Sequence, residues 1–218
     1  MTQLTKVPAP VALRQTQREI TRMGHIAADN LKRALDCFFN YSMSKAASVR
    51  SHEESVNILN HLIADAMVDR RSLDLSPENM RRVSMMTIAV TDIERLSDHA
   101  ENIVEYIEQM NAKKAEMSEA ARKELLDMSQ DALDAVYLAL DIFEKDDYSK
   151  LDQIEILEQH VDDHEKDLIN NHIERIMNSM CNPLGGVIFS DLVTDLERCS
   201  DHAINLAYAL KERPSELD

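Results

Sequence analysis

A thirteen-residue segment occurs twice in this chain, 103 residues apart. The first copy is TDIERLSDHAENI at 91–103, and the second is TDLERCSDHAINL at 194–206. Nine of the thirteen positions are identical, and eight of these nine are polar. Because a hydrophobic core tolerates different apolar residues of similar size, repetition of the same charged side chains indicates a shared task. The repeat therefore predicts one fold built from two similar halves.

The composition of both halves favours helices. The 218 residues include only 3 Gly and 5 Pro, no Trp and 4% aromatic residues. Leu, Ala, Glu and Met, which are good helix formers, are abundant. A hydrophobic content of 44% is sufficient for a continuous core. No segment has the alternating pattern of a strand, and we expect an all-α protein.

Apolar residues at helical spacing predict three helices in each half. The first half has predicted helices at about 13–38, 48–68 and 77–111, and the second at about 118–144, 151–180 and 187–211. Ser76 and Pro77 mark a helix start near the Asp74–Pro77 loop, and Pro183 with two glycines predicts a break at 181–186. We expect two tandem antiparallel three-helix bundles, with a tether at 1–12, a first repeat at 13–112 and a second at 118–212.

Each copy of the repeated segment contains a Glu-x-x-x-Asp pair. Four residues along a helix are about one turn, so both carboxylates of a pair lie on one face. Like charges at this spacing repel each other, and a bound cation would convert that repulsion into a set of ligands. The two pairs are Glu94 with Asp98 and Glu197 with Asp201.

A second pair of positions lies on the middle helix of each half. At an offset of 105 residues, which also aligns Phe143 with Phe38, Glu158 and Asp162 fall on Glu53 and Asn57. The pairs flank the apolar seam, and helix axes pack about 8–10 Å apart, so carboxylates of adjacent helices can share a cation. Oxygen ligands suit Mg²⁺, Mn²⁺, Fe or Ca²⁺, and Zn²⁺ is also compatible. The candidate metal ligands are therefore Glu53, Glu94, Asp98, Glu158, Asp162, Glu197 and Asp201.

The histidines of the chain have a different interpretation. His99 and His202 follow the Asp of each pair and point about 100° away from it, which favours packing or supporting roles over ligation. His160 and His164 have the four-residue spacing of a metal pair. Because His164 falls on the apolar seam, we interpret them as half-buried core histidines. Arg95 and Arg198 are expected to form ion pairs with a nearby Asp.

Charge and cysteine content limit the partners. The formal net charge of −16 argues against nucleic acid or an anionic membrane surface and fits metal cations or a basic protein surface. Three cysteines without a metal-like or redox spacing suit a reducing cytoplasm, and Cys199 is interpreted as a core residue. No apolar stretch approaches the roughly 20 residues of a spanning helix, so we expect no membrane insertion.

The repeated segments resemble the signature of the PhoU family, the regulators of phosphate uptake. The signature stands here as Asp92-Ile93-Glu94-Arg95…Asp98-His99-Ala100 and again at 195–203, with Ser97 and Ser200 where the family usually has glycine. The similarity extends from about Leu13 to Leu210. It implies two three-helix repeats whose Glu/Asp-x-x-x-Asp motifs bind multinuclear metal clusters, with Fe, Mn, Zn or Mg as the ion. Asn57 departs from the acidic pattern, which implies a weaker first site.

The opening segment Val7–Gly24 resembles the region that joins the membrane part of sodium–phosphate cotransporters to a cytoplasmic PhoU-like domain. This likeness implies a cytoplasmic domain tethered to the inner or plasma membrane through a transporter. The expected partner is a membrane phosphate transporter domain or a regulatory protein, and a homodimer is compatible with the pattern. The expected role is regulatory rather than enzymatic.

Two alternatives use the same residues. A carboxylate-bridged dimetal enzyme in a helical bundle typically carries Glu-x-x-His pairs. The residues three positions after Glu53, Glu94, Glu158 and Glu197 are Val56, Ser97, Val161 and Ser200, which argues against it. A purely structural adaptor would leave the acidic faces in solvent. No nucleophile–base pair and no phosphate-binding glycine loop is recognisable, so no catalytic residue is predicted.

Overall fold

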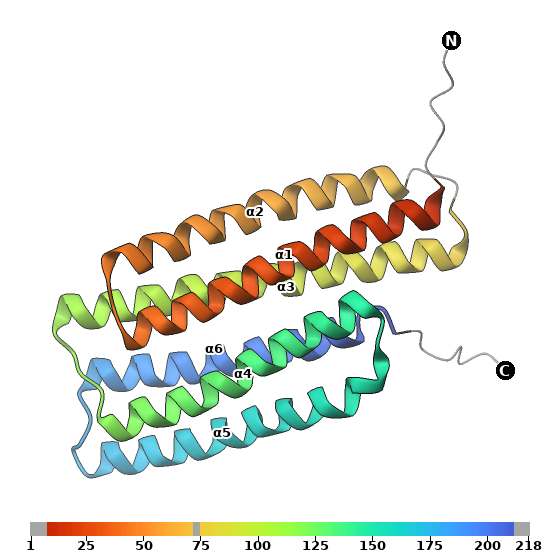
Figure 1. The fold of residues 1–218 in the computed structure, drawn as a ribbon. Helices are drawn as coiled ribbons and strands as arrows, with labels where there is room; N and C mark the ends of the chain where they lie inside the picture. Colours follow the sequence, from red (N-terminus) through yellow and green to blue (C-terminus); the bar gives the residue numbers. More distant parts are fainter. Residues whose placement is uncertain (1–7, 72–74, 212–218) are drawn as a thin grey trace.

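The computed structural model describes residues 8–71 and 75–211, which form six α-helices and one short 3₁₀ helix. The elements are α1 (Ala9–Phe39), α2 (Met43–Arg71), α3 (Pro77–Lys113), α4 (Glu119–Lys145), η1 (Tyr148–Lys150), α5 (Leu151–Met177) and α6 (Pro183–Tyr208). Helices α1–α3 form one antiparallel bundle and α4–α6 form a second beside it (Figure 1). The predicted fold class is confirmed. None of the helices in these ranges combines the length and hydrophobicity needed to cross a membrane.

The same apolar positions form the core of both halves. Phe38 in α1 and Phe143 in α4 are each 1% exposed. Met23 and Met128, which the same alignment pairs, are both fully buried. Helices α1 and α4 each pack against both other helices of their own bundle. The sequence alignment of the two halves therefore identifies equivalent core residues.

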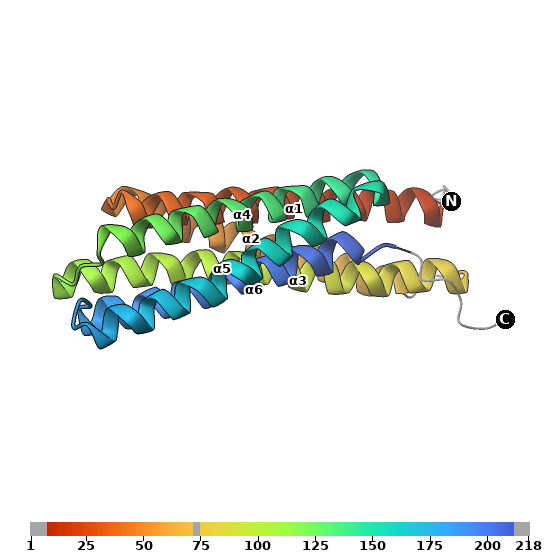
Figure 2. The same ribbon diagram turned by 90° about the horizontal axis from the view of Figure 1, so that it is seen from below.

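The two bundles contact each other through α1 against α4 and α3 against α6. Figure 2 shows α1 and α4 together along one side of the molecule. A Cβ atom on Gly24 would lie 2.3 Å from Leu140 Cδ2 and 3.3 Å from Ile93 Cδ1. The glycine therefore permits α1 to approach α4 closely, and the leucine would have to move for any larger residue.

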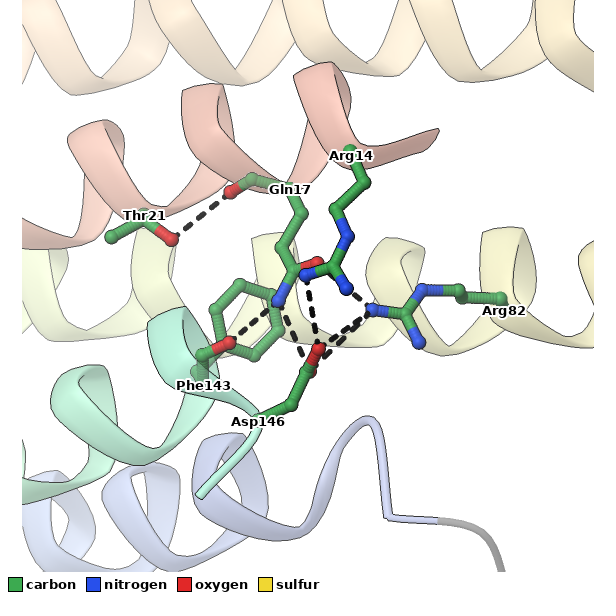
Figure 3. A network of polar contacts seen from close by, with 6 residues as sticks. All are labelled: Arg14, Gln17, Thr21, Arg82, Phe143 and Asp146. Carbon is green, nitrogen blue, oxygen red and sulfur yellow. Dashed lines mark hydrogen bonds and ion pairs between the residues drawn. The ribbon is translucent and has the colours of Figure 1, made fainter. Parts of the chain in front are cut away.

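A polar network joins the bundles at the end of α4 (Figure 3). The buried Gln17 side chain of α1 donates a hydrogen bond to the Phe143 carbonyl oxygen at 2.7 Å and one to Asp146 at 3.2 Å. Arg82 of α3 donates to the Gln17 side-chain oxygen at 2.9 Å and lies 3.4 Å from Asp146. Asp146 ends α4 in the left-handed conformation, with a φ of 53°. The network connects α1, α3 and α4 and fixes one end of the interface between the halves.

Three helices begin earlier than the sequence predicts. Helix α1 begins at Ala9, so residues 9–12 of the proposed tether are helical, and residues 1–7 lie outside the described residues. Pro10 is tolerated because a first-turn residue has no helical acceptor for its N–H. Helix α2 begins at Met43 because the Ser42 hydroxyl accepts the Lys45 N–H at 3.2 Å.

The third early start corrects the break predicted at 181–186. Helix α6 begins at Pro183, and the Asn182 side chain accepts hydrogen bonds from the N–H groups of Leu184 and Gly185 at 3.1 Å. A Cβ atom on Gly185 would lie 2.5 Å from the Glu116 carbonyl oxygen. This glycine therefore allows close packing inside a helix and does not end one. The start of α3 is as predicted, with the Ser76 hydroxyl accepting the Asn79 N–H, whereas Asp74 lies outside the described residues.

Candidate functional site

The acidic residues of the second half face one another across α5 and α6. Glu158 and Asp162 come from α5, and Glu197 and Asp201 come from α6. Burial raises the pKa of Glu158, and the carboxylates of Asp162 and Asp201 raise it further. Asp201 belongs to the neighbouring helix. Its influence on Glu158 therefore indicates that the carboxylates of the two helices are close in space.

Glu197 reports the same proximity from the other helix. Burial is the largest cause that raises its pKa, followed by the charges of Asp201, Glu165 and Asp162. The sequence analysis missed Glu165. It follows Asp162 by three residues, a spacing that places both on one side of α5, and this spacing was the available signal. The second-half cluster thus includes Glu165 in addition to the four carboxylates that the sequence identifies.

The first half has an acidic cluster on α2 and α3 with one motif carboxylate fewer, since Asn57 aligns with Asp162. Burial raises the pKa of Glu53, and so does the charge of Glu101, whereas a hydrogen bond donated by Asn57 lowers it and Asp98 raises it. Glu101 affects Glu53 more than Asp98 does, although sequence position alone places it a turn beyond the motif. Glu94 is half-buried on α3, one turn before Asp98.

The carboxylates of each half lie beside the helix pair α2–α3 or α5–α6, but they are not gathered around one point as the ligands of a metal are. Across residues 8–71 and 75–211, no three His, Cys, Asp or Glu side chains are grouped tightly enough to hold an ion. Cationic side chains reach the same faces: Arg95 lies 3.6 Å from Asp98, as expected, and Lys166 lies 3.9 Å from Asp162. A bound cation would therefore require these side chains to rotate toward a common point.

The histidines of the repeated segment join the two halves. His99 Nδ1 lies 2.9 Å from Asp195 Oδ1, and His202 Nδ1 lies 3.0 Å from Asp92 Oδ1. The pairs are reciprocal, since each connects α3 with α6 and the two rings lie 5.7 Å apart between centroids. Asp195 also accepts a hydrogen bond from the Tyr106 hydroxyl at 2.8 Å. The two histidines pack at the interface between the halves, and their pairing with Asp195 and Asp92 was not predicted from the sequence.

Asp92 and Asp195 are the partners that sequence reasoning missed. Both are buried, with exposures of 7% and 5%. Asp92 precedes His99 by seven residues, and Asp195 precedes His202 by seven. Seven residues are about two helical turns, so each Asp and His share one side of their helix. The repeated polar residues are thus explained in part by a reciprocal contact between the halves.

The comparison with protein families gives one match. The family model for the PhoU domain matches residues 20–107 and again residues 125–210. The chain belongs to the PhoU family. The two matches correspond to the two helical bundles of the fold.

Solved PhoU structures have the same fold. PhoU from Pseudomonas aeruginosa superimposes with a TM-score of 0.86 at 18% identity, over 93% of this chain and 97% of that one. The phosphate transport system regulatory protein PhoU from Streptococcus pneumoniae gives 0.82 at 18% identity, over 93% and 95%. A PhoU-like protein from Shewanella oneidensis MR-1 gives 0.63 at 13% identity, over 89% and 96%. The comparison with curated protein sequences finds no match.

The two PhoU repeats of this chain differ in the charges beside their acidic clusters. Arg50 of α2 lies 3.9 Å from Glu101 and binds both oxygens of Glu108, at 2.9 and 2.6 Å. At the equivalent position α5 carries Glu155, whose charge raises the pKa of Glu158. The first repeat thus has a cation where the second has an additional carboxylate.

The other pair of histidines in the second PhoU repeat is only partly as predicted. His164 is half-buried, and its Nε2 lies 3.2 Å from Asp131. His160 is exposed, so its interpretation as a half-buried core residue is wrong. Four residues place both on one side of α5, but only His164 lies close enough to the apolar seam to be half-buried. Cys199 is fully buried, and burial raises the pKa of its thiol, as expected of a core residue.

Proposed function

We propose that this chain is a metal-binding regulatory domain in phosphate transport that has no enzymatic activity of its own. Membership of the PhoU family supports the regulatory role, because the PhoU protein from Streptococcus pneumoniae is described as a phosphate transport system regulatory protein. The acidic faces of the two repeats support the metal, since they concentrate oxygen ligands for a cation. The proposal assigns no catalytic nucleophile.

The raised pKa values of Glu158 and Glu197 are the observation that supports metal binding most directly. Each glutamate is affected by carboxylates of the facing helix as well as by its own burial. Such an arrangement is unfavourable for the ionised protein without a counter-charge, and a divalent cation would relieve it. The bound ion would supply positive charge that draws the two helices together.

The proposed ligands are the residues that the sequence identifies. In the second half they are Glu158, Asp162, Glu197 and Asp201, to which Glu165 is a structural addition, and in the first half they are Glu53, Glu94 and Asp98. Oxygen-only sets bind Mg²⁺, Mn²⁺ and Fe, and also Zn²⁺. The ion's contribution to the protein's role is structural: it sets the spacing of α2 from α3 and of α5 from α6.

The partner in this proposal is a membrane phosphate transporter domain or a regulatory protein, reached from the cytoplasm. The acidic surface suits a basic protein partner better than nucleic acid, given the net charge of −16. The likeness of Val7–Gly24 to the cotransporter junction supports a tethered arrangement, in which α1 continues from the membrane part. Residue Val7 itself lies outside the described residues.

Thermal unfolding of metal-stripped protein tests the metal hypothesis. An ion at 100 times its dissociation constant stabilises the folded protein by about 2.7 kcal/mol, which corresponds to a rise in Tm of about 5 to 10 °C. We expect this rise with Mn²⁺, Fe²⁺ or Zn²⁺ and its loss in the double variant Glu197→Gln, Asp201→Asn.

The matched control for this test is Asp163→Asn with Asp167→Asn. These two residues are also four apart on α5, but both are exposed and lie outside the candidate ligands. The control should keep the full rise in Tm. A melting temperature that no divalent ion changes would reject the metal-binding part of the proposal.

A further inference from the structure

An apolar groove opens between the last turns of α5 and the first turns of α6, beyond the acidic site. Its volume is about 560 Å³. Helix α4 packs against both α5 and α6 within the bundle, whereas three apolar side chains of the groove are exposed: Ile173 by 49%, Ile176 by 54% and Val187 by 59%. The residues that matter here are Ile169, His172, Ile173, Ile176, Gly186 and Val187.

Gly186 accounts for the depth of the groove. A Cβ atom at this position would lie 3.0 Å from His172 Cε1, so the glycine lets the imidazole form the floor. The His172 ring lies against Phe189, with 4.9 Å between centroids. In the first half the aligned residues are Val83 and Met67, and both are buried apolar side chains. Glycine at 186 and histidine at 172 are thus particular to the second half.

The surroundings of the groove are acidic. From Asp167 to Glu197 the only lysine or arginine is Arg175, which is 9% exposed and lies 2.8 Å from Glu124. Exposed carboxylates of Asp167, Glu174 and Asp191 lie in the same segment, and Asp191 lines the groove. Glu165, one turn before Ile169 on α5, belongs to the acidic cluster around Glu197. Exposed apolar side chains therefore lie beside a negative rim. Lys166, which adjoins Glu165 on α5, lies 3.6 Å from Asp163 and 3.9 Å from Asp162.

We propose that this groove binds an amphipathic helix of a partner protein, with apolar residues on one face and lysine or arginine beside them. A cleft between two antiparallel helices accepts a third helix through apolar residues at i, i+3, i+4 and i+7. Clustered exposed apolar residues are typical of interaction sites, and the acidic rim favours a basic helix over an acidic one. The inference rests on the proposed function in one respect: a regulatory domain requires a surface for its partner.

Fluorescence anisotropy with a labelled peptide tests this inference. The probe is a helical peptide of about 18 residues, or five turns, with Leu at the groove-facing positions and Lys on the flanking positions. A peptide of the same composition with Leu and Lys scattered controls for attraction to the net charge of the protein. We expect the patterned peptide to bind at least about tenfold more tightly than the scattered one, a difference of about 1.4 kcal/mol.

Two substitutions locate the binding site. Ile173→Glu should weaken binding of the patterned peptide about tenfold or more, and Val187→Glu should do the same from α6. The matched control is Val68→Glu, because Val68 is exposed on α2 at the position aligned with Ile173. The control should leave affinity unchanged, since Val68 does not line the groove.

Three results would overturn the inference: equal binding of the two peptides, no binding of the patterned peptide, or equal affinity of wild type and Ile173→Glu. A dimer of the wild type that Ile173→Glu dissociates, seen by sedimentation, would assign the groove to a second copy and also overturn it. The titrations are performed in EDTA, and the Mn²⁺-dependent rise in Tm is measured on the same variants. Absence of peptide binding by the wild type, with an intact Mn²⁺-dependent rise in Tm, rejects only this inference. Peptide binding that Ile173→Glu weakens, with no effect of Mn²⁺ on Tm, rejects only metal binding.

Discussion

Phe38 and Phe143 occupy equivalent positions in the two halves and are equally buried, whereas Asn57 and Asp162, also equivalent, carry different charges. Asn57 donates a hydrogen bond to Glu53, but Asp162 repels Glu158. At the position aligned with Arg50, one turn before Glu158, the second half has Glu155. The comparison separates two kinds of constraint: the core must be filled in the same way twice, while the acidic faces can diverge.

The difference between the acidic faces follows from electrostatics. A dication is held by compensating negative charge, and the second half supplies Glu158, Asp162, Glu197 and Asp201 with Glu165 nearby. The first half offers Glu53, Glu94 and Asp98, with Glu101 close to Glu53 but also near Arg50. The second half therefore suffers more repulsion without metal and should gain more from binding it.

Replacing the equivalent core phenylalanines has the largest expected effect. Phe38→Ala and Phe143→Ala each remove a buried ring and leave a cavity, which costs about 3 to 5 kcal/mol. Urea unfolding of both variants should give similar losses in the free energy of unfolding. A large loss of unfolding free energy in only one of the two variants would show that the two cores do not contribute equally to stability.

The two reciprocal His–Asp pairs should contribute unequally to the free energy of unfolding. Asp195→Ala leaves both the His99 Nδ1–H and the Tyr106 hydroxyl without their acceptor in a buried site, and we expect a cost of about 2 to 4 kcal/mol. Asp92→Ala removes the acceptor of His202 alone, whose side chain is 21% exposed, and should cost about 1 kcal/mol. Chemical unfolding of the two variants measures both losses in the free energy of unfolding. A larger cost for Asp92→Ala would contradict the observed hydrogen bonding.

The pH dependence of Glu197→Gln tests the repulsion in the second half. The folded protein holds the Glu197 proton more tightly than the unfolded chain, because burial and neighbouring carboxylates raise its pKa. Ionisation therefore lowers stability as pH rises from the ordinary value of 4.5 through the raised pKa. In EDTA at neutral pH, Glu197→Gln should melt at a higher temperature than wild type, and the difference should vanish in acid. Thermal scans that show the opposite sign would refute the account.

Most of the fold could be predicted from the sequence, because helical periodicity and the internal repeat are local and repeated signals. The starts of α2 and α6 were missed because the Ser42 and Asn182 side chains bond to backbone N–H groups without altering the apolar pattern. The start of α1 was missed because its first turn contains Pro10, which resembles part of a tether. Gly185 resembles a helix break until its contact with Glu116 is known. Such contacts depend on how the elements pack.

The candidate site was predictable at the level of residue pairs and not beyond it. Spacing placed each Glu and Asp on one helix face, but the influence of Glu101 on Glu53 and of Glu165 on Glu197 depends on how neighbouring helices are rotated. The pairing of Asp92 with His202 joins residues 110 positions apart. Local spacing shows which residues share a helix face, but not which residues of another helix they meet. The groove at Gly186 likewise depends on the ring of His172 from another helix.

Calorimetric titration of metal-stripped protein with Mn²⁺, comparing wild type with Asn57→Asp and Asp162→Asn, tests the central claim most directly. The account predicts two sites, of which the second-half site is the tighter. Asp162→Asn should weaken that site, and Asn57→Asp should strengthen the other and narrow the gap, because each changes the carboxylate count by one. A tighter first-half site, or two affinities that neither substitution changes, would contradict it.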